Sequence, residues 1–212
     1  SLVKDRTALA NRIRGYLQEM GLFLVKGLSQ VRKKVPLFLE DAENELTFEM
    51  REIISSCHKK LLELDKDIER YTQKIEDFCD QHEVCQRLMK LSGVGPMIAS
   101  IVYATIGEPK NFKNGRHFAA FLGLVPKEHS SGGKHCLMSI SKRGDRYIRS
   151  LLIHGGRSVV KVSGKKDDYL SCWVQRIHKE RGYNKAAVAV ANKNARHMWA
   201  IMAYDDKYVD HL

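Results

Sequence analysis

The sequence lacks the patterns that mark a membrane protein or a secreted, disulfide-bonded one. No apolar run among its 212 residues approaches the roughly 18 residues of a membrane span, and no signal peptide is visible at the N-terminus. Its five cysteines are odd in number, scattered along the chain and without CxxC or Cys-His ligand spacing. These absences predict reduced thiols in a cytoplasmic protein that has no zinc site.

Two further absences concern the fold and the chemistry. Strand-like alternation is scarce and no repeat is present, so the pattern predicts a mainly α protein. Residues 86–212 hold only nine acidic residues, and their two acidic pairs, Asp167-Asp168 and Asp205-Asp206, have the character of a helix cap and a terminal surface. No complete metal site is visible, so a metal nuclease is not expected from this chain.

What is abundant is positive charge, and it is unevenly distributed. The chain has 36 lysines and arginines against 25 acidic residues, a net charge of +11, which is typical of proteins with polyanionic partners. The balance predicts a basic helical segment (1–39), an acidic coiled-coil helix (40–85) and a basic C-terminal domain (86–212). Within the first segment, Pro36 predicts a turn or a short helix before it.

The acidic segment carries apolar residues in a heptad pattern. They alternate in spacings of three and four: Thr47, Met50, Ile54, Cys57, Leu61, Leu64, Ile68, Tyr71, Ile75 and Phe78. This period predicts a long helix that pairs with another helix. The partner is either the helix predicted over residues 5–20 or, as we favour, a second subunit.

A helix-hairpin-helix signature follows over residues 88–102. Gly93 and Gly95 flank a valine, and Pro96 begins an apolar helix. The glycines permit a tight turn, and the N–H groups at the start of the second helix can hold a phosphate. The alternative is a hairpin that only packs the helices together.

A serine pair next to glycines precedes a cationic run. Ser130 and Ser131 come before two glycines, so little side-chain bulk shields their hydroxyls. Lysine and arginine are the donors that bind phosphodiesters. The cationic candidates are Lys134, Lys142, Arg143, Arg146 and Arg149. For the arginines, phosphate clamps are favoured over a solvated helix face.

The residues alone leave two interpretations of the serines. A serine hydrolase is not expected, because the Gly-x-Ser-x-Gly nucleophile elbow is absent and the surrounding pattern is helical. One interpretation is a serine that attacks a phosphodiester, with cations stabilising the transition state. The other is a binding loop whose serines only shape a turn, which is the commoner use of Ser-Ser-Gly-Gly.

Four motifs, in this order, resemble those of a known family. They are Leu91-Ser92-Gly93-Val94-Gly95-Pro96, Phe118-Ala119-Ala120-Phe121-Leu122-Gly123-Leu124-Val125-Pro126, His129-Ser130-Ser131-Gly132-Gly133-Lys134 and Ile140-Ser141-Lys142-Arg143-Gly144-Asp145-Arg146-Tyr147-Ile148-Arg149. They closely resemble the C-terminal transposase domain of insertion-sequence family 110 with its 1111 branch, the IS116/IS110/IS902 type of Piv-like DEDD-plus-serine recombinases. Residues 6–15 and the acidic helix are similar to the segment that links the family's two catalytic domains.

The resemblance implies a DNA transposase that supplies a serine nucleophile. The family's nucleophile comes directly before the glycine of the loop, which here makes it Ser131, with Ser130 as the alternative. DNA is the implied partner. In some members a structured RNA from the element also pairs with donor and target DNA. The competing hypothesis is a non-catalytic helix-hairpin-helix module that binds nucleic acid.

The resemblance also implies a second domain. In this family an N-terminal RuvC-like domain supplies four acidic metal ligands, and no such acids precede residue 1. We therefore expect a fragment that binds nucleic acid and dimerises through the coiled coil but does not recombine alone. No cofactor is expected in this chain. Magnesium is expected in the RuvC-like domain, and the expected location is the bacterial cytosol or nucleoid.

Overall fold

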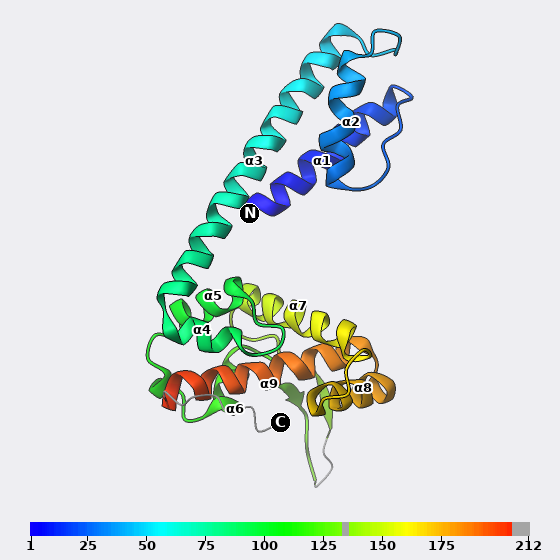
Figure 1. The fold of residues 1–212 in the computed structure, drawn as a ribbon. Helices are drawn as coiled ribbons and strands as arrows, with labels where there is room; N and C mark the ends of the chain where they lie inside the picture. The colour runs from blue at the N-terminus through cyan, green and yellow to red at the C-terminus, as the bar shows by residue number, and fades with distance from the viewer. Residues whose placement is uncertain (133–135, 205–212) are drawn as a thin grey trace. The chain divides into compact units, whose positions relative to one another are not determined.

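The computed structural model describes residues 1–132 and 136–204. These residues form nine α-helices, one 3-10 helix (η1, Pro109–Asn111) and two short strands, which confirms the prediction of a mainly α fold. The chain divides into two compact units, Ser1–Lys74 and Ile75–Leu212 (Figure 1).

Three helices share one apolar core in the first unit. α1 spans Leu2–Glu19, α2 spans Leu28–Glu40 and α3 spans Phe48–Gln81, and the first two lie beside the first part of α3 (Figure 1). The buried residues of this core are Leu9, Ala10, Ile13, Leu17, Val31, Val35, Leu46, Ile54 and Leu61. Each large side chain stabilises the fold by about 1.5–3 kcal/mol when buried, so the three helices depend on one another.

The first part of the predicted heptad seam is covered within the chain. Ile54 and Leu61 are fully buried among side chains of α1 and α2, and Leu64 packs against the same cluster. We favoured a second subunit as the partner of this helix. In the first part of the seam, the apolar faces of α1 and α2 from the same chain take that place. Tyr71, further along α3, is exposed, and pairing of that part with a second copy stays a prediction.

The second helix is longer than its sequence predicted. We expected a turn or a short helix before Pro36, but α2 continues through the proline to Glu40. Val31 and Val35 are fully buried in the shared core. Their burial offsets the cost of a proline inside a helix, which is about 3 kcal/mol.

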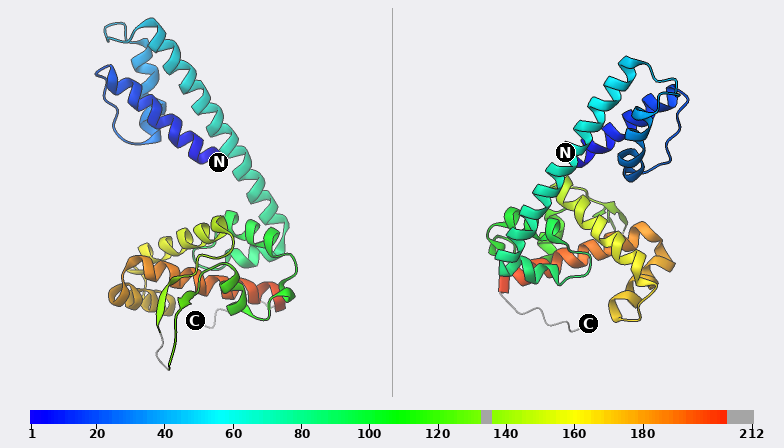
Figure 2. Two further views of the ribbon diagram at one scale, coloured as in Figure 1. Left: turned by 180° about the vertical axis from the view of Figure 1, so that it is seen from behind. Right: turned by 45° about the horizontal axis from the view of Figure 1, so that its top comes forward.

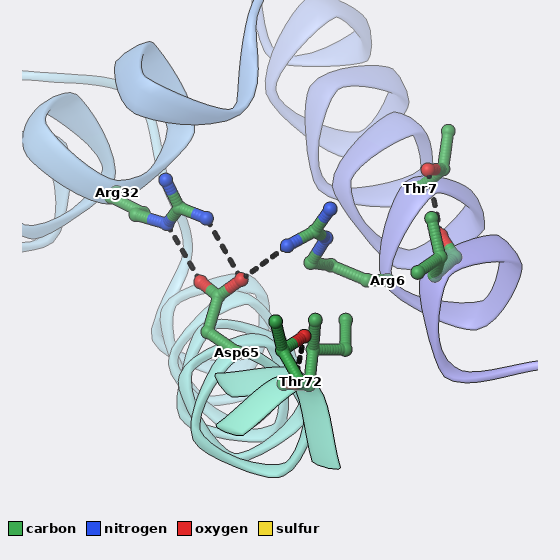
Figure 3. A network of polar contacts seen from close by, with 7 residues as sticks. Arg6, Thr7, Arg32, Asp65 and Thr72 are labelled. Atoms are coloured by element: carbon green, nitrogen blue, oxygen red, sulfur yellow. Dashed lines mark hydrogen bonds and ion pairs between the residues drawn. The ribbon is translucent and has the colours of Figure 1, made fainter. Parts of the chain in front are cut away.

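An ion-pair network ties the three helices of this unit together (Figure 3). Arg32 of α2 donates from Nε to Asp65 Oδ2 at 2.6 Å and from Nη2 to Oδ1 at 2.8 Å. Arg6 of α1 donates from Nη1 to the same Oδ1 at 3.0 Å. The hydrogen bonds from Arg32, assisted by Arg6, hold the pKa of the Asp65 carboxyl below its usual value. Asp65 on α3 is therefore the shared anion of two other helices.

The second unit is built around its last helix, α9. That helix contacts α4, α6, α7, α8 and η1. Gly156 permits a close approach of α7 to α9, because a Cβ there would lie 2.3 Å from the carbonyl oxygen of Ala187 on α9. The helices are α4 (Glu83–Met89), α5 (Pro96–Ile106), α6 (Gly115–Phe121), α7 (Arg146–Ser163), α8 (Tyr169–Arg181) and α9 (Tyr183–Tyr204).

A β-hairpin projects from the helices of the second unit (Figures 1 and 2). Strand β1 (Pro126–Glu128) runs antiparallel to β2 (Leu137–Ile140), with an irregular register between their ends. The sequence predicted helical structure around the serine loop, and this prediction is wrong. Strands of three and four residues, nearly all with exposed side chains, are too short to show an alternating pattern.

Candidate nucleic-acid interface

The serine pair lies on the projecting hairpin, directly after β1. The Ser130 hydroxyl donates to Glu128 Oε1 at 2.5 Å and accepts from the Cys136 N–H at 3.4 Å. The His129 N–H donates to the Cys136 carbonyl oxygen at 3.0 Å. Ser130 therefore joins the two arms of the hairpin, as a turn-shaping serine would. Ser131, the next residue, is exposed.

Close backbone packing fixes the base of the hairpin. A Cβ on Gly123 would lie 2.1 Å from the Arg143 carbonyl oxygen, and one on Gly144 would lie 2.0 Å from that of Phe121. Both glycines have positive φ. Lys142, two residues before Gly144, also has a positive φ of 56°. The segment that follows β2 is thus pressed against the end of α6.

Arg149 has a different role from the phosphate clamp that its sequence suggested. It is buried, with 8% of its surface exposed. Its Nη1 donates to the carbonyl oxygens of Arg143 at 2.8 Å and Leu122 at 3.2 Å, with longer contacts to Gly144 and Asp145. A guanidinium that satisfies several backbone carbonyls is committed to holding this segment, so we correct the assignment.

The other cationic candidates at the hairpin base are exposed. Lys142, Arg143 and Arg146 all face solvent, and Asp145 caps α7 by accepting from the Ile148 N–H at 2.8 Å. The structure brings these three cations together around the start of α7. Lys134, the remaining candidate, lies outside the described residues.

The hairpin separates Ser131 from these cations. Ser131 comes five residues after Pro126, which pairs with Ile140 at the base. At about 3.3 Å per residue, the serine lies roughly 15 Å along the arm from Lys142. Ser131 and Lys142 therefore belong to neighbouring motifs in the sequence but lie far apart along the hairpin.

The two glycines of the predicted helix-hairpin-helix have unlike surroundings. Gly93, with φ of 82°, lies in the turn between α4 and α5, and a Cβ there would lie 2.6 Å from the carbonyl oxygen of Gly155 on α7. Gly95 precedes Pro96, the first residue of α5, and a Cβ on it would meet nothing within 4 Å. Gly93 thus serves packing, whereas Gly95 leaves the start of α5 open. The helix-hairpin-helix assignment itself stays a prediction.

A basic groove, which the sequence analysis did not predict, lies between the hairpin and the last two helices. Its volume is about 1200 Å³, and β2, α8 and α9 line it. The signal was available on α9, where Lys185, Asn192 and Arg196 share one face opposite a face of buried alanines.

The described residues contain no metal-binding cluster, and two of their cysteine thiols are buried. In residues 1–132 and 136–204, no three His, Cys, Asp or Glu side chains gather as a metal site. The acidic metal ligands that the resemblance implies therefore have no counterpart among these residues. Burial raises the pKa of Cys85 to about 12 and also raises that of Cys79, so both thiols stay protonated.

The helices of the described part are all too short or too polar to cross a bilayer. This agrees with the charge that every long helix carries along its length.

Comparison with known proteins identifies relatives. Residues 85–171 match the model of the Transposase IS116/IS110/IS902 family. The chain is similar to the transposase for insertion sequence element IS1111A of Coxiella burnetii, with 41% identity over 98% of the chain and 57% of that relative. It is also similar to the transposase for insertion sequence element IS1328 of Yersinia enterocolitica, with 31% identity over 95% of the chain and 59% of the relative.

The chain thus spans less than two thirds of the length of these relatives. The matched residues include the α4–α5 turn, the serine hairpin, the basic start of α7 and the beginning of α8. Residues 85–171 are therefore similar to the transposase domain of the IS116/IS110/IS902 family.

Proposed function

We propose that this chain is the serine-bearing part of an insertion-sequence transposase and that Ser131 attacks a DNA phosphodiester. The observation that carries the proposal is the division of labour between the two serines. Both serines are exposed, but the Ser130 hydroxyl is engaged by Glu128 and Cys136 within the hairpin, which leaves Ser131 as the candidate nucleophile. An exposed serine near the end of a projecting arm suits attack on a substrate bound outside the core of its own unit.

The proposed step exchanges one phosphoester bond for another. The Ser131 oxygen forms a bond to phosphorus, and the bond from phosphorus to the departing deoxyribose oxygen breaks. The serine proton passes to a base, and the departing oxygen gains a proton, so the number of bonds and protons is conserved. Strand transfer is the same exchange in reverse with a new strand. Cations that contact the phosphate lower the barrier by stabilising its added negative charge.

The proposal includes DNA binding by the second unit. Its support is the exposed cluster of Lys142, Arg143 and Arg146 at the start of α7, together with the open start of α5 at Gly95. Because cations release condensed counterions when they meet phosphates, we expect affinity to fall steeply as salt rises. A guide RNA, partnership with a magnesium-binding RuvC-like domain, and a dimer formed through the later part of α3 complete the proposal.

Paired serine variants test the nucleophile. In a protein that joins this chain to a RuvC-like domain of the family, Ser131→Ala should abolish strand transfer and leave DNA affinity unchanged. Ser130→Ala removes only hairpin hydrogen bonds and should lower activity by about tenfold or less. Equal loss of affinity and activity in Ser131→Ala would count against the nucleophile.

A non-catalytic binding module is the second candidate. Ser131 lies roughly 15 Å along the hairpin from the cations near Lys142. This separation favours the binding module, because these cations then do not reach a phosphate that is bound at the serine. Under this alternative, neither Ser131→Ala nor Ser130→Ala changes strand transfer. The serine variants therefore separate the two functions.

A further inference from the structure

The basic groove of the second unit has the charge of a site for a polyanion. Six of its lining side chains are basic: Arg176, Arg181, Lys185, Lys193, Arg196 and His197. Glu180 is its one acidic lining residue among those described. Arg181, Lys185 and Arg196 are exposed, so their charges are accessible to a ligand in the groove.

The same groove offers aromatic and apolar surface. Tyr169 is 62% exposed, and the Lys193 ammonium lies 5.6 Å from the centre of its ring and 5.1 Å from that of Trp173. From the hairpin, Leu137 and Met138 are 67% and 54% exposed and line the opposite side. Exposed apolar side chains that gather in one place mark an interaction surface.

Cations beside aromatic rings are the combination that binds unpaired nucleic acid. Phosphates pair with the cations, and bases stack on the rings, whatever the base sequence. A duplex presents mainly phosphates to a protein groove and keeps its base faces stacked inside, so it uses the cations but not the rings. The pairing of both surfaces in one groove therefore favours a single strand.

We propose that the groove between β2 and the helices α8 and α9 binds a single-stranded nucleic-acid segment. Its phosphates lie along the cations of α8 and α9, and its bases lie against Tyr169 and the apolar side chains of β2. The inference rests on the nucleic-acid binding of the proposed function, but it does not require Ser131 to act as a nucleophile. Single-stranded DNA and single-stranded RNA share this chemistry, and the test separates them.

The test measures binding of labelled oligonucleotides of about 16 nucleotides to the whole chain by fluorescence anisotropy. The probes are single-stranded DNA, single-stranded RNA and the matching DNA duplex. The charge-reversed protein carries Arg181→Glu and Lys185→Glu. Its control carries Lys161→Glu and Lys165→Glu, which change the net charge equally at exposed positions outside the groove.

We expect the groove variant to bind the single-stranded probes at least tenfold more weakly, and the control to lose threefold or less. Tyr169→Ala should weaken single-strand binding and leave duplex binding unchanged. The single-stranded probe that binds more tightly identifies the strand as DNA or RNA, and either result supports the groove. Circular dichroism establishes that each variant is folded.

Equal losses in the groove variant and its control would overturn the inference, as would a Tyr169→Ala protein that binds every probe normally. Ser131→Ala should bind all three probes like the wild type. Groove variants with normal binding, alongside strand transfer that requires Ser131, would refute the groove and keep the proposed function. Binding that depends on the groove, together with strand transfer that does not require Ser131, would keep the groove and refute the nucleophile.

Discussion

At the scale of single residues, burial separates side chains that look alike in the sequence. Arg146 and Arg149 lie one turn apart at the start of α7, yet the first is exposed and the second is buried against backbone carbonyls. A buried cation is stable only where its donors are satisfied, and the carbonyls of Leu122 and Arg143 provide that satisfaction. The two arginines therefore belong to different functions.

We predict that Arg149→Ala lowers the free energy of unfolding by about 2–3 kcal/mol, because it removes a charged donor and leaves carbonyl oxygens unpaired. Urea denaturation followed by circular dichroism measures the loss. Arg146→Ala is the matched control. It should change stability by about 0.5 kcal/mol or less and instead weaken DNA binding. A stable Arg149→Ala protein with weakened DNA binding would restore Arg149 as a phosphate clamp.

The two glycines near α5 give a second contrast at this scale. Gly93→Ala should destabilise the protein by about 2–4 kcal/mol, because it combines a positive φ with a clash against Gly155. In Gly95→Ala the added Cβ has no other atom within 4 Å, so this substitution should leave stability nearly unchanged. If the start of α5 holds a phosphate, Gly95→Ala should still lower DNA affinity in anisotropy titrations. Unchanged affinity would mean that this hairpin only packs helices.

These residue roles were only partly readable from the sequence. The sequence correctly marked the Asp167-Asp168 pair as a helix cap, because Asp168 caps α8 by accepting from the N–H of Ser171, only three residues away. It did not distinguish Arg149 from Arg146, because the carbonyls that hold Arg149 include that of Leu122, far away in the sequence. Placement of Ser131 at a distance from the cations likewise depends on the hairpin.

At the scale of elements, α3 has different environments along its length. Leu61 is fully buried against α1 and α2, whereas Tyr71, in the same heptad series, is 48% exposed. A heptad pattern shows that a helix has a partner but not whether the partner is the same chain. The first part of the seam is now assigned to the chain itself.

We predict that Leu61→Ala lowers the free energy of unfolding by about 2–4 kcal/mol through the cavity it leaves, without changing the mass in light scattering. Tyr71→Ala should change stability by about 0.5 kcal/mol or less. If the later part of α3 forms the dimer, Tyr71→Asp should lower the mass. A Leu61→Ala protein that stays folded but loses its partner would mean that the buried seam joins two chains.

The Asp65 network gives the first unit a dependence on pH. Its lowered pKa means that the folded state favours the ionised carboxylate, so the stabilisation is fully present above the unfolded-state pKa of about 3.9. It is lost as the pH falls through the lowered folded-state pKa. Asp65→Asn should therefore cost about 1 kcal/mol at pH 7, since the pair is partly exposed, and progressively less below about pH 4.

Urea midpoints of the wild type and of Asp65→Asn across this pH range measure the effect. Asp67→Asn, which breaks only the exposed pair with Arg70, is the control and should have little effect at any pH. A difference between wild type and Asp65→Asn that stayed constant down to pH 3 would contradict the assignment of the lowered pKa to Asp65.

The prediction of helices and strands failed in two places, where tertiary packing outweighed a local preference and where a strand was too short to show a pattern. Pro36 suggested an end to its helix, but the burial of Val31 and Val35 keeps α2 intact. The strands of the serine hairpin contain too few residues for a period to appear. The cap of α8 at Asp168 was predicted well because its signal is local.

At the scale of the whole molecule, the fold organises a strongly basic chain into distinct surfaces. The second unit carries the serine hairpin, the cations at its base and the groove along α8 and α9. Charge counting predicted a polyanionic partner, but it could not locate the groove. That surface arises only where the hairpin meets two helices that follow it by some thirty residues or more.

The central claim is that Ser131 is the nucleophile of a transposase, and its direct test is covalent. The protein that joins this chain to a RuvC-like domain is assembled with element-end DNA, flanking RNA and magnesium, and then denatured. Mass spectrometry locates any DNA that remains attached. Our account predicts a phosphodiester on Ser131. An adduct on another residue, or strand transfer that proceeds normally in Ser131→Ala, would contradict it.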